Sequence, residues 1–139
     1  MTGNLTFTII KPHAVSDNNT GSILSHISRA GFRISAIKMT MLSRVRTEEF
    51  YQEHKGKEFF NQLVDMMSSG PIVVAVLEKE NAVSDLRLLI GSTDPDKAEE
   101  GTVRKIFGKS MRENAIHASD SDENAVRESC FFFSELEKF

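Results

Sequence analysis

The sequence predicts an α/β sandwich in which helices pack against a small, four-stranded antiparallel sheet. Three observations support this fold class. Residues 5–9 alternate apolar and polar side chains with the period of two that is typical of a half-buried strand. Residues 72–77 form a continuous apolar run, rich in β-branched side chains, as expected for a strand covered on both faces. Apolar side chains at Ile23, Ile27 and Ala30 recur at helical spacing between these two segments.

The first strand is expected to end near Lys11, because Pro12 has no backbone N–H to donate to a sheet. The polar residues 16–19 offer several N-caps for a helix, and Gly31 is placed to end that helix. Residues 32–42 are predicted to form a second strand, although their pattern is mixed. The chain therefore begins as strand, helix, strand.

Two helices are expected next. Thr47 is a candidate cap for the first of them, and residues 59–67 form the second. After the strand at 72–77, Asn81 is expected to cap a helix that Gly91 ends. These segments extend the alternation of strands and helices.

The last third of the chain is less regular. Residues 102–111 are weakly helical, and residues 114–122 show no secondary-structure periodicity, so a loop is expected there. Ser121 or Asp122 is predicted to cap a short helix through Arg127. Residues 129–133 are predicted to form the final strand because their side chains have high β-propensity. A ferredoxin-like βαββαβ plan, with helices against one face of the sheet, fits this order best, and the strand order stays open.

Length and composition limit the classes of function. A chain of 139 residues suits a single domain over residues 1–139. The net charge of -3 gives no general attraction to nucleic acid or to anionic lipid, so neither a specific nucleic acid nor a membrane is an expected partner. No apolar stretch is long enough to span a bilayer, residues 1–5 do not resemble a secretory signal, and Cys130 has no second cysteine to pair with. A cytoplasmic location follows as an expectation, with Cys130 expected to be buried.

His117 is the main candidate for chemistry. It lies among small and polar residues, where an imidazole is accessible to a substrate and can act as a nucleophile or base. A lone histidine is more often structural, and the same holds for His13, His26 and His54. Whether His117 is structural or catalytic must therefore be judged from the residues around it.

Those residues carry a family resemblance. The segment Asn114-Ala115-Ile116-His117-Ala118-Ser119-Asp120 resembles the active-site signature of nucleoside diphosphate kinases. The similarity runs from Phe7 almost to the C-terminus, through residues 10–12, 31–33, 59–60, 69–71, 101–104 and 119–121.

The resemblance implies a ferredoxin-like fold and a ping-pong reaction. His117 would take the γ-phosphate of a nucleoside triphosphate, become a phosphohistidine, and give the phosphate to a nucleoside diphosphate. Glu128 matches the carboxylate that orients the ring, Ser119 the hydroxyl that bonds this carboxylate, and Tyr51 a phenol that donates to the phosphate. Taken alone, Glu128 and Ser119 would be an ordinary carboxylate and a loop hydroxyl.

The resemblance also implies the substrate-binding residues. Three cations match the phosphate ligands, which phosphoryl transfer requires because positioning and charge supply most of its catalysis. The full set is Lys11, Arg87, Arg104 and Thr93 for the phosphates, Asn114 with Lys11 for the sugar, and Phe59, Leu63 and Met111 for the base. A base held by stacking implies broad nucleotide specificity. On their own, Arg87 and Arg104 would be solvated helix charges, and Phe59 and Leu63 would be core.

Magnesium is expected to arrive on the nucleotide phosphates, because the sequence has no Cys/His cluster spaced for a resident metal. Asp120 could touch the ion through water. Family membership implies a homo-oligomer, and a hexamer is preferred over a tetramer. Two departures from the family pattern are His13 in place of an acid and Glu58 in place of a proline, with Lys57 replacing an arginine.

Two rival functions stay open at this level. One is a nucleotide-binding regulator with weakened catalysis, and the other is a histidine-dependent phosphatase that gives the phosphate to water. Turnover of a triphosphate without a diphosphate acceptor identifies the phosphatase. Binding without transfer identifies the regulator.

Overall fold

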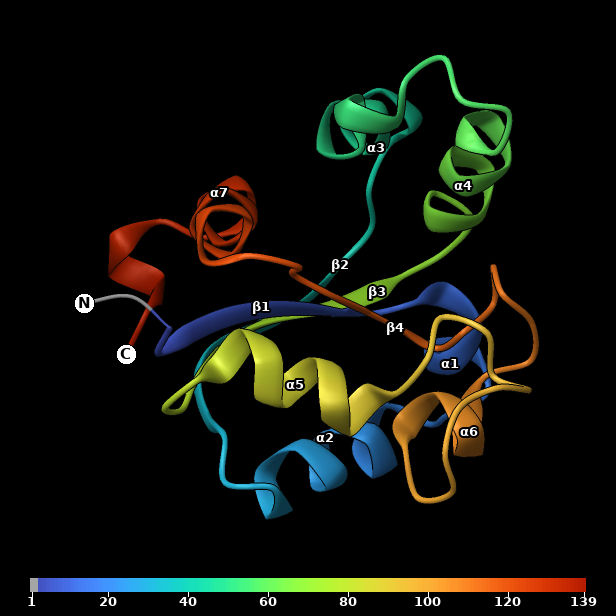
Figure 1. The fold of residues 1–139 in the computed structure, drawn as a ribbon. Helices are drawn as coiled ribbons and strands as arrows, with labels where there is room; N and C mark the ends of the chain where they lie inside the picture. The colour runs from blue at the N-terminus through green and yellow to red at the C-terminus, as the bar shows by residue number, and fades with distance from the viewer. Residues whose placement is uncertain (1–2) are drawn as a thin grey trace.

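The computed structural model describes residues 3–139, whose strands form one antiparallel sheet (Figure 1). The strands lie in the order β2-β3-β1-β4. Their bounds are β1 Leu5–Ile10, β2 Arg33–Thr40, β3 Ile72–Glu78 and β4 Ile116–Ala118. This confirms the predicted four-stranded sheet and supplies the ferredoxin-like strand order that the sequence left open.

Seven α-helices and two short 3-10 helices accompany the sheet within residues 3–139. The α-helices are α1 Pro12–Ser16, α2 Thr20–Arg29, α3 Arg44–Phe50, α4 Phe60–Met67, α5 Ala82–Ile90, α6 Val103–Phe107 and α7 Asp122–Phe132. The 3-10 helices are η1 Gln52–His54 and η2 Glu135–Glu137. No helix in this described part of the chain is long and apolar enough to span a bilayer.

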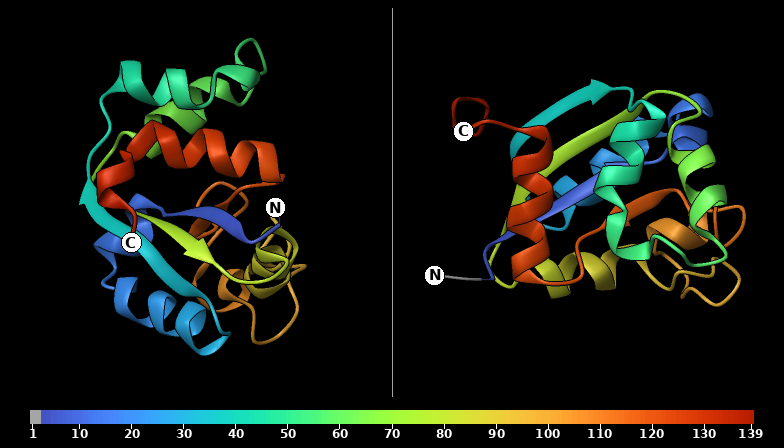
Figure 2. Two further views of the ribbon diagram at one scale, coloured as in Figure 1. Left: turned by 90° about the vertical axis from the view of Figure 1, so that its left-hand side faces the viewer. Right: turned by 90° about the horizontal axis from the view of Figure 1, so that it is seen from above.

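Helices cover both faces of the sheet, so the prediction that they pack on one face was wrong. Figure 1 and the turned views in Figure 2 show α3, α4 and α7 on one side and α2, α5 and α6 on the other. The physical reason is β1, which is buried on both faces because Phe7 and Ile9 point to one core and Ile10 to the other. A strand with two apolar faces needs two layers of helices.

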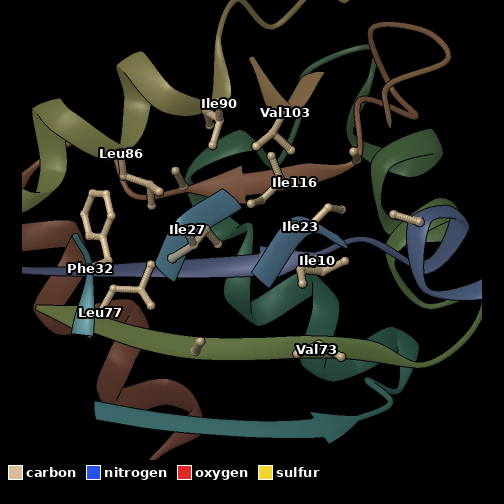
Figure 3. Close-up of a cluster of buried hydrophobic side chains, with 14 of the residues drawn as sticks. Ile10, Ile23, Ile27, Phe32, Val73, Leu77, Leu86, Ile90, Val103 and Ile116 are labelled. Carbon is tan, nitrogen blue, oxygen red and sulfur yellow. The ribbon is translucent and has the colours of Figure 1, made fainter. Parts of the chain in front are cut away.

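The core between the sheet and α2, α5 and α6 is shown in Figure 3. Ile23 and Ile27 of α2 and Leu86 and Ile90 of α5 are fully buried there, at the helical spacing that the sequence displays. Burying each aliphatic side chain of this size contributes roughly 1.5–3 kcal/mol. The core fixes the sheet as a rigid base for the loops at its edge.

The fourth strand is not where the sequence placed it. Residues 129–132 belong to α7, in which Ala125, Glu128, Ser129 and Phe132 are buried at i, i+3, i+4 and i+7. This helical face packs on β1, and its burial outweighs the local β-propensity of the aromatic residues. Cys130 points away from that face and is exposed, which corrects the expectation of a buried thiol.

The strand at the edge is instead β4, within the segment predicted to be a loop. Its three residues pair with β1, with His117 opposite Ile9. Two cap predictions hold: Ser121 accepts a bond from the backbone N–H of Asn124, and Gly91 ends α5 at a φ of 88°. The Thr47 cap was wrong, because Ser43 caps α3 and Thr47 lies inside that helix.

Candidate functional site

The predicted site residues meet at one cavity of about 590 Å³, beside β4 and the N-terminal end of α1. Eleven of the twelve line it: Lys11, Tyr51, Phe59, Leu63, Arg87, Thr93, Arg104, Met111, Asn114, His117 and Glu128. The twelfth, Ser119, is fully buried behind the cavity wall and contacts Glu128. Segments more than 100 residues apart in the chain thus form a single site.

Five further residues line the cavity that the sequence did not single out as site residues: Phe50, Glu53, His54, Arg112 and Ala118. His54 is the most informative, because its ring lies 5.3 Å from that of Phe59 and 6.4 Å from that of Tyr51. It is the histidine nearest in the sequence to these two aromatic site residues. That proximity is the only signal that could have indicated its place.

His117 is held by the sheet and by aromatic rings. Its backbone pairs with β1, and its carbonyl oxygen accepts a 2.7 Å hydrogen bond from the Thr8 hydroxyl. The rings of Phe50 and Tyr51 approach the imidazole edge-on, with centroids 5.7 and 6.2 Å away. The side chain is 20% exposed. A rigid backbone and a packed ring leave the imidazole one accessible edge.

Glu128 determines which nitrogen of His117 is free. Its Oε1 lies 2.9 Å from His117 Nε2 and accepts a 2.6 Å bond from the Ser119 hydroxyl. An ionised carboxylate only accepts, so Nε2 carries the proton of the neutral imidazole and the lone pair lies on Nδ1. The site therefore presents Nδ1 as a nucleophile.

The charge of Glu128 is maintained despite its burial. Burial opposes ionisation, but the hydrogen bond from His117, the hydrogen bond from Ser119 and the nearby Arg127 together lower the pKa of Glu128. The carboxylate is therefore ionised at neutral pH. It is positioned to stabilise positive charge that develops on the ring.

Tyr51 offers a donor to the cavity. Its hydroxyl is buried and has no hydrogen-bond partner among residues 3–139. Burial, followed by the negative charge of Glu128, raises the pKa of Tyr51 far above its usual value. The phenol is consequently protonated and able to donate to an anion.

Three basic side chains, Lys11, Arg87 and Arg104, also line the cavity. Burial and then the charge of Arg104 lower the pKa of Lys11 to about 7, and burial and then Arg87 lower the pKa of Arg104 to about 10. Such mutual repulsion in a buried place is costly unless an anion joins the cluster. The arrangement is built to take a multiply charged anion such as a polyphosphate.

Arg104 also fixes the backbone around the site. Its guanidinium donates to the carbonyl oxygens of Gly91 at 3.1 Å and Ile116 at 2.8 Å. Its Nε is buried and has no partner within the described residues. Arg87 Nη1 lies 3.4 Å from the Ala118 carbonyl oxygen. Both arginines are therefore oriented by the strand that carries His117.

The remaining predicted residues form a polar and an apolar end of the cavity. The Asn114 amide donates to the carbonyl oxygens of Thr93 and Met111, at 3.1 and 2.9 Å, and its own oxygen has no partner within residues 3–139. Phe59 and Leu63 lie on the α4 side and Met111, 59% exposed, on the opposite loop. A flat ring can enter between these apolar groups.

No three His, Cys, Asp or Glu side chains within residues 3–139 cluster in a way that could hold a metal ion. Asp120 lines the cavity as a carboxylate, since a bond from Asn124 leads the causes that lower its pKa. One carboxylate with phosphate oxygens and waters is a typical magnesium environment.

Comparison with known proteins gives a consistent result. The family model described as nucleoside diphosphate kinase matches residues 4–138. The nucleoside diphosphate kinase of Flavobacterium psychrophilum is 49% identical over 139 residues, covering all of both chains. That of Chlorobium limicola is 52% identical over 129 residues, covering 93% of this chain and 92% of its own.

Solved structures agree with the sequence relatives. A crystal structure of the Aquifex aeolicus nucleoside diphosphate kinase superposes with a TM-score of 0.96 at 43% identity, covering 98% of this chain and 99% of that one. The structure of the Halobacterium salinarum enzyme in complex with CDP gives a TM-score of 0.92 at 32% identity, covering 99% and 91%.

Proposed function

Since this chain belongs to the nucleoside diphosphate kinase family, we propose that it works through a phosphohistidine on Nδ1 of His117. The overall reaction moves the γ-phosphate of a nucleoside triphosphate to a nucleoside diphosphate. The observation that carries the proposal is the 2.9 Å contact between His117 Nε2 and Glu128, which leaves Nδ1 free at the cavity. The predicted family and enzyme class are confirmed.

In the first half-reaction the Nδ1 lone pair attacks the γ-phosphorus. The bond from that phosphorus to the bridging β–γ oxygen breaks, and the nucleoside diphosphate leaves. The ring becomes positively charged as the N–P bond forms, and the ionised Glu128 opposite Nε2 stabilises that charge. In the second half-reaction a terminal oxygen of another diphosphate attacks the phosphorus, and the lone pair returns to Nδ1.

The phosphate ligands act mainly by charge and position. Lys11, Arg87 and Arg104 compensate the phosphate charges, and Tyr51 donates its hydroxyl to the group in transfer. Thr93 is proposed to contact the phosphates, and Asn114, together with Lys11, the sugar hydroxyls. Ser119 acts through Glu128 and does not reach the substrate itself.

Magnesium is proposed to come with the nucleotide. The fit rests on Asp120, the ionised carboxylate at the cavity, which would hold the ion through water. The ion would neutralise charge on the phosphate oxygens when bound. The protein's own cations, Lys11, Arg87 and Arg104, remain responsible for orienting the phosphates.

The base is proposed to lie between Phe59 and Met111, with Leu63 beside it. Stacking tolerates any base because every base has a π-face. The Halobacterium relative was solved with CDP, a pyrimidine nucleotide, which supports the use of pyrimidine nucleotides at this site. We expect similar kcat/KM values for purine and pyrimidine donors. A preference of several orders of magnitude would contradict a base held by stacking between Phe59 and Met111.

Assembly and location complete the proposal. We propose that residues 1–139 act as one domain, because both cores share a single sheet. We propose a homo-oligomer, and a hexamer in preference to a tetramer. Association is supported by Ile37, Met39 and Met41, which are 45%, 61% and 59% exposed on and just beyond the edge strand β2. Light scattering that shows only monomers at working concentrations would contradict it. We propose a cytoplasmic location, in which a single exposed cysteine stays reduced.

The test is incubation with γ-labelled triphosphate and magnesium, followed by a basic quench. Wild-type protein is expected to carry an acid-labile label that a diphosphate removes, and His117→Gln is expected to carry none. The matched control is His26→Gln, because His26 of α2 packs against Phe107 of α6 and does not line the cavity. Unlabelled wild-type protein refutes the phosphohistidine, and label lost to water without a diphosphate indicates a phosphatase.

A further inference from the structure

The backbone of Ala115, the residue before β4, has an unusual conformation. Ala115 is fully buried and has a φ of 78°, in the left-handed region that a side chain with Cβ rarely adopts. It follows Asn114, which is proposed to bind the sugar, and precedes the nucleophile His117 by two residues. A small shift of Ala115 would therefore move both groups.

Two hydrogen bonds fix this residue. The Ala115 carbonyl oxygen accepts from the backbone N–H of Lys11 at 2.9 Å, and the Ala115 N–H donates to Nε2 of His13 at 2.8 Å. The second bond is a side-chain contact across 102 residues of sequence, and it is buried. The strained backbone is thus maintained by an imidazole from α1.

The imidazole of His13 can play this role only when it is neutral. Nε2 must offer its lone pair to the Ala115 N–H, so the proton of the neutral ring lies on Nδ1, which is buried without a partner among residues 3–139. Protonation would place a hydrogen on Nε2 facing the N–H of Ala115. Two donors cannot bond each other, so the peptide would lose its anchor.

We propose that His13 is a positioning residue whose neutral imidazole holds the Ala115 peptide, and that protonation of His13 slows phosphoryl transfer by releasing that peptide. The inference rests on the proposed function of the same site. His13 touches neither the nucleotide cavity nor His117 directly. Its effect is transmitted through the backbone from Ala115 to Asn114 and His117.

The surroundings of His13 favour the neutral ring. Burial is the largest cause that lowers its pKa, and the charges of Lys109 and Lys11 act in the same direction. Glu113 and Asp17 act against them, and the net direction is downward from the ordinary value of 6.5. Asp17 is itself paired with Lys109 at 2.7 Å, which weakens its pull on the ring. Protonation is therefore expected below pH 6.5.

The sign of the effect on stability follows. Because the pKa of His13 is lower in the folded state than the ordinary value of 6.5, His13 does not reduce the free energy of unfolding above pH 6.5. That free energy decreases as the pH falls from 6.5 through the folded-state pKa. Activity should fall over the same range.

The experiment compares pH profiles of kcat/KM for nucleoside diphosphate phosphorylation from pH 8 to 5. His13→Gln keeps an amide oxygen that can accept the Ala115 N–H and does not titrate. The acid limb of log kcat/KM against pH is expected to be steeper for wild type than for His13→Gln by about one unit of slope, because only wild type loses activity through protonation of residue 13. The variant should then retain roughly 10-fold more activity per pH unit below the His13 pKa. His26→Gln, the matched control, should keep the wild-type slope.

A second measurement uses the intact wild-type protein. Nitrogen NMR of labelled histidine should show His13 as the Nδ1–H tautomer at pH 7.5, with an unprotonated Nε2. An Nε2–H tautomer or a charged ring at that pH overturns the proposal even if His13→Gln does not fold. Equal acid slopes for wild type and His13→Gln overturn it as well. Absence of any transfer by wild type at pH 8 would instead mean that the proposed function has failed.

Discussion

Replacing Glu128 by glutamine separates the charge of this residue from its position. The glutamine side chain keeps an oxygen that can accept from His117 Nε2 and from the Ser119 hydroxyl, which lie 2.9 and 2.6 Å from Oε1 of the native carboxylate. The negative charge is removed, and an amide NH2 replaces Oε2, which lies 3.6 Å from Arg127 Nη2 and away from the bonds to His117 and Ser119. Any loss of rate therefore measures how much that charge stabilises the ring as it becomes positive.

The magnitude follows from the burial of the pair. The side chains of His117 and Glu128 are 20% and 5% exposed, so their interaction is screened less than on the surface. Two unit charges about 4 Å apart interact by about 4 kcal/mol at an effective dielectric constant of 20. A hydrogen bond to a charged group contributes about 1.5–3 kcal/mol. Since the ring is only partly charged in the transition state, we expect a loss of about 2–3 kcal/mol, or roughly 30- to 150-fold in rate.

The assay is single-turnover labelling of the protein by γ-labelled triphosphate in a quench-flow instrument. Glu123→Gln is the matched control, because Glu123 lies in the first turn of the same helix but is exposed and outside the cavity. The control should stay within about twofold of wild type. If folded Glu128→Gln labels within threefold of wild type, the carboxylate charge has no role in catalysis and the reasoning fails.

Three further predictions concern the cavity and the fold. Tyr51→Phe should slow transfer about 10-fold without lowering the melting temperature, because the buried hydroxyl has no partner among residues 3–139 to lose; a cooperative drop in stability would contradict this. Lys11→Met should abolish most activity but raise the melting temperature at pH 7. Burial lowers the pKa of Lys11 from 10.5 to about 7, so charging this lysine makes the folded wild-type protein less stable as the pH falls from 10.5 toward 7. Methionine carries no charge and avoids this loss. Calorimetry should show that the gain in melting temperature shrinks as the pH approaches 10.5. A gain that does not depend on pH would contradict the buried charge of Lys11 as its cause. Gly91→Ala should lower the free energy of unfolding in urea by about 1–3 kcal/mol, because φ is 88° and a Cβ would lie 2.6 Å from Thr102 Oγ1. Gly21→Ala, on α2 with open space around it, should change stability in the opposite direction or not at all.

The elements that the sequence predicts well are those whose patterns are local. The alternation in β1 and the apolar run of β3 identify strands before any partner is known, and the stripes of α2 and α5 are complete within each helix. The end of α5 at Gly91 follows from the one residue type that adopts its φ readily. These predictions hold because no distant contact is needed to decide them.

The errors lie where a partner decides the conformation. The three residues of β4 are a strand only because β1 supplies their hydrogen bonds, so no periodicity marks them. Residues 129–132 have side chains that favour strands, but the face they share with Ala125 and Glu128 is buried only as a helix. Strand pairing decided the first place, and burial of a helical face outweighed local propensity in the second.

The sequence by itself determined the family and the reaction class, because the residue types around His117 and their order along the chain are specific, and it indicated most of the side chains that line the cavity. Only the tertiary structure decided which nitrogen of His117 is free, since that depends on Glu128 reaching it from α7. It also decided that His13 bonds the peptide at Ala115. A hydrogen bond between residues far apart in the chain has no local pattern, and it exists only when the cores on both faces of the sheet bring the two groups together.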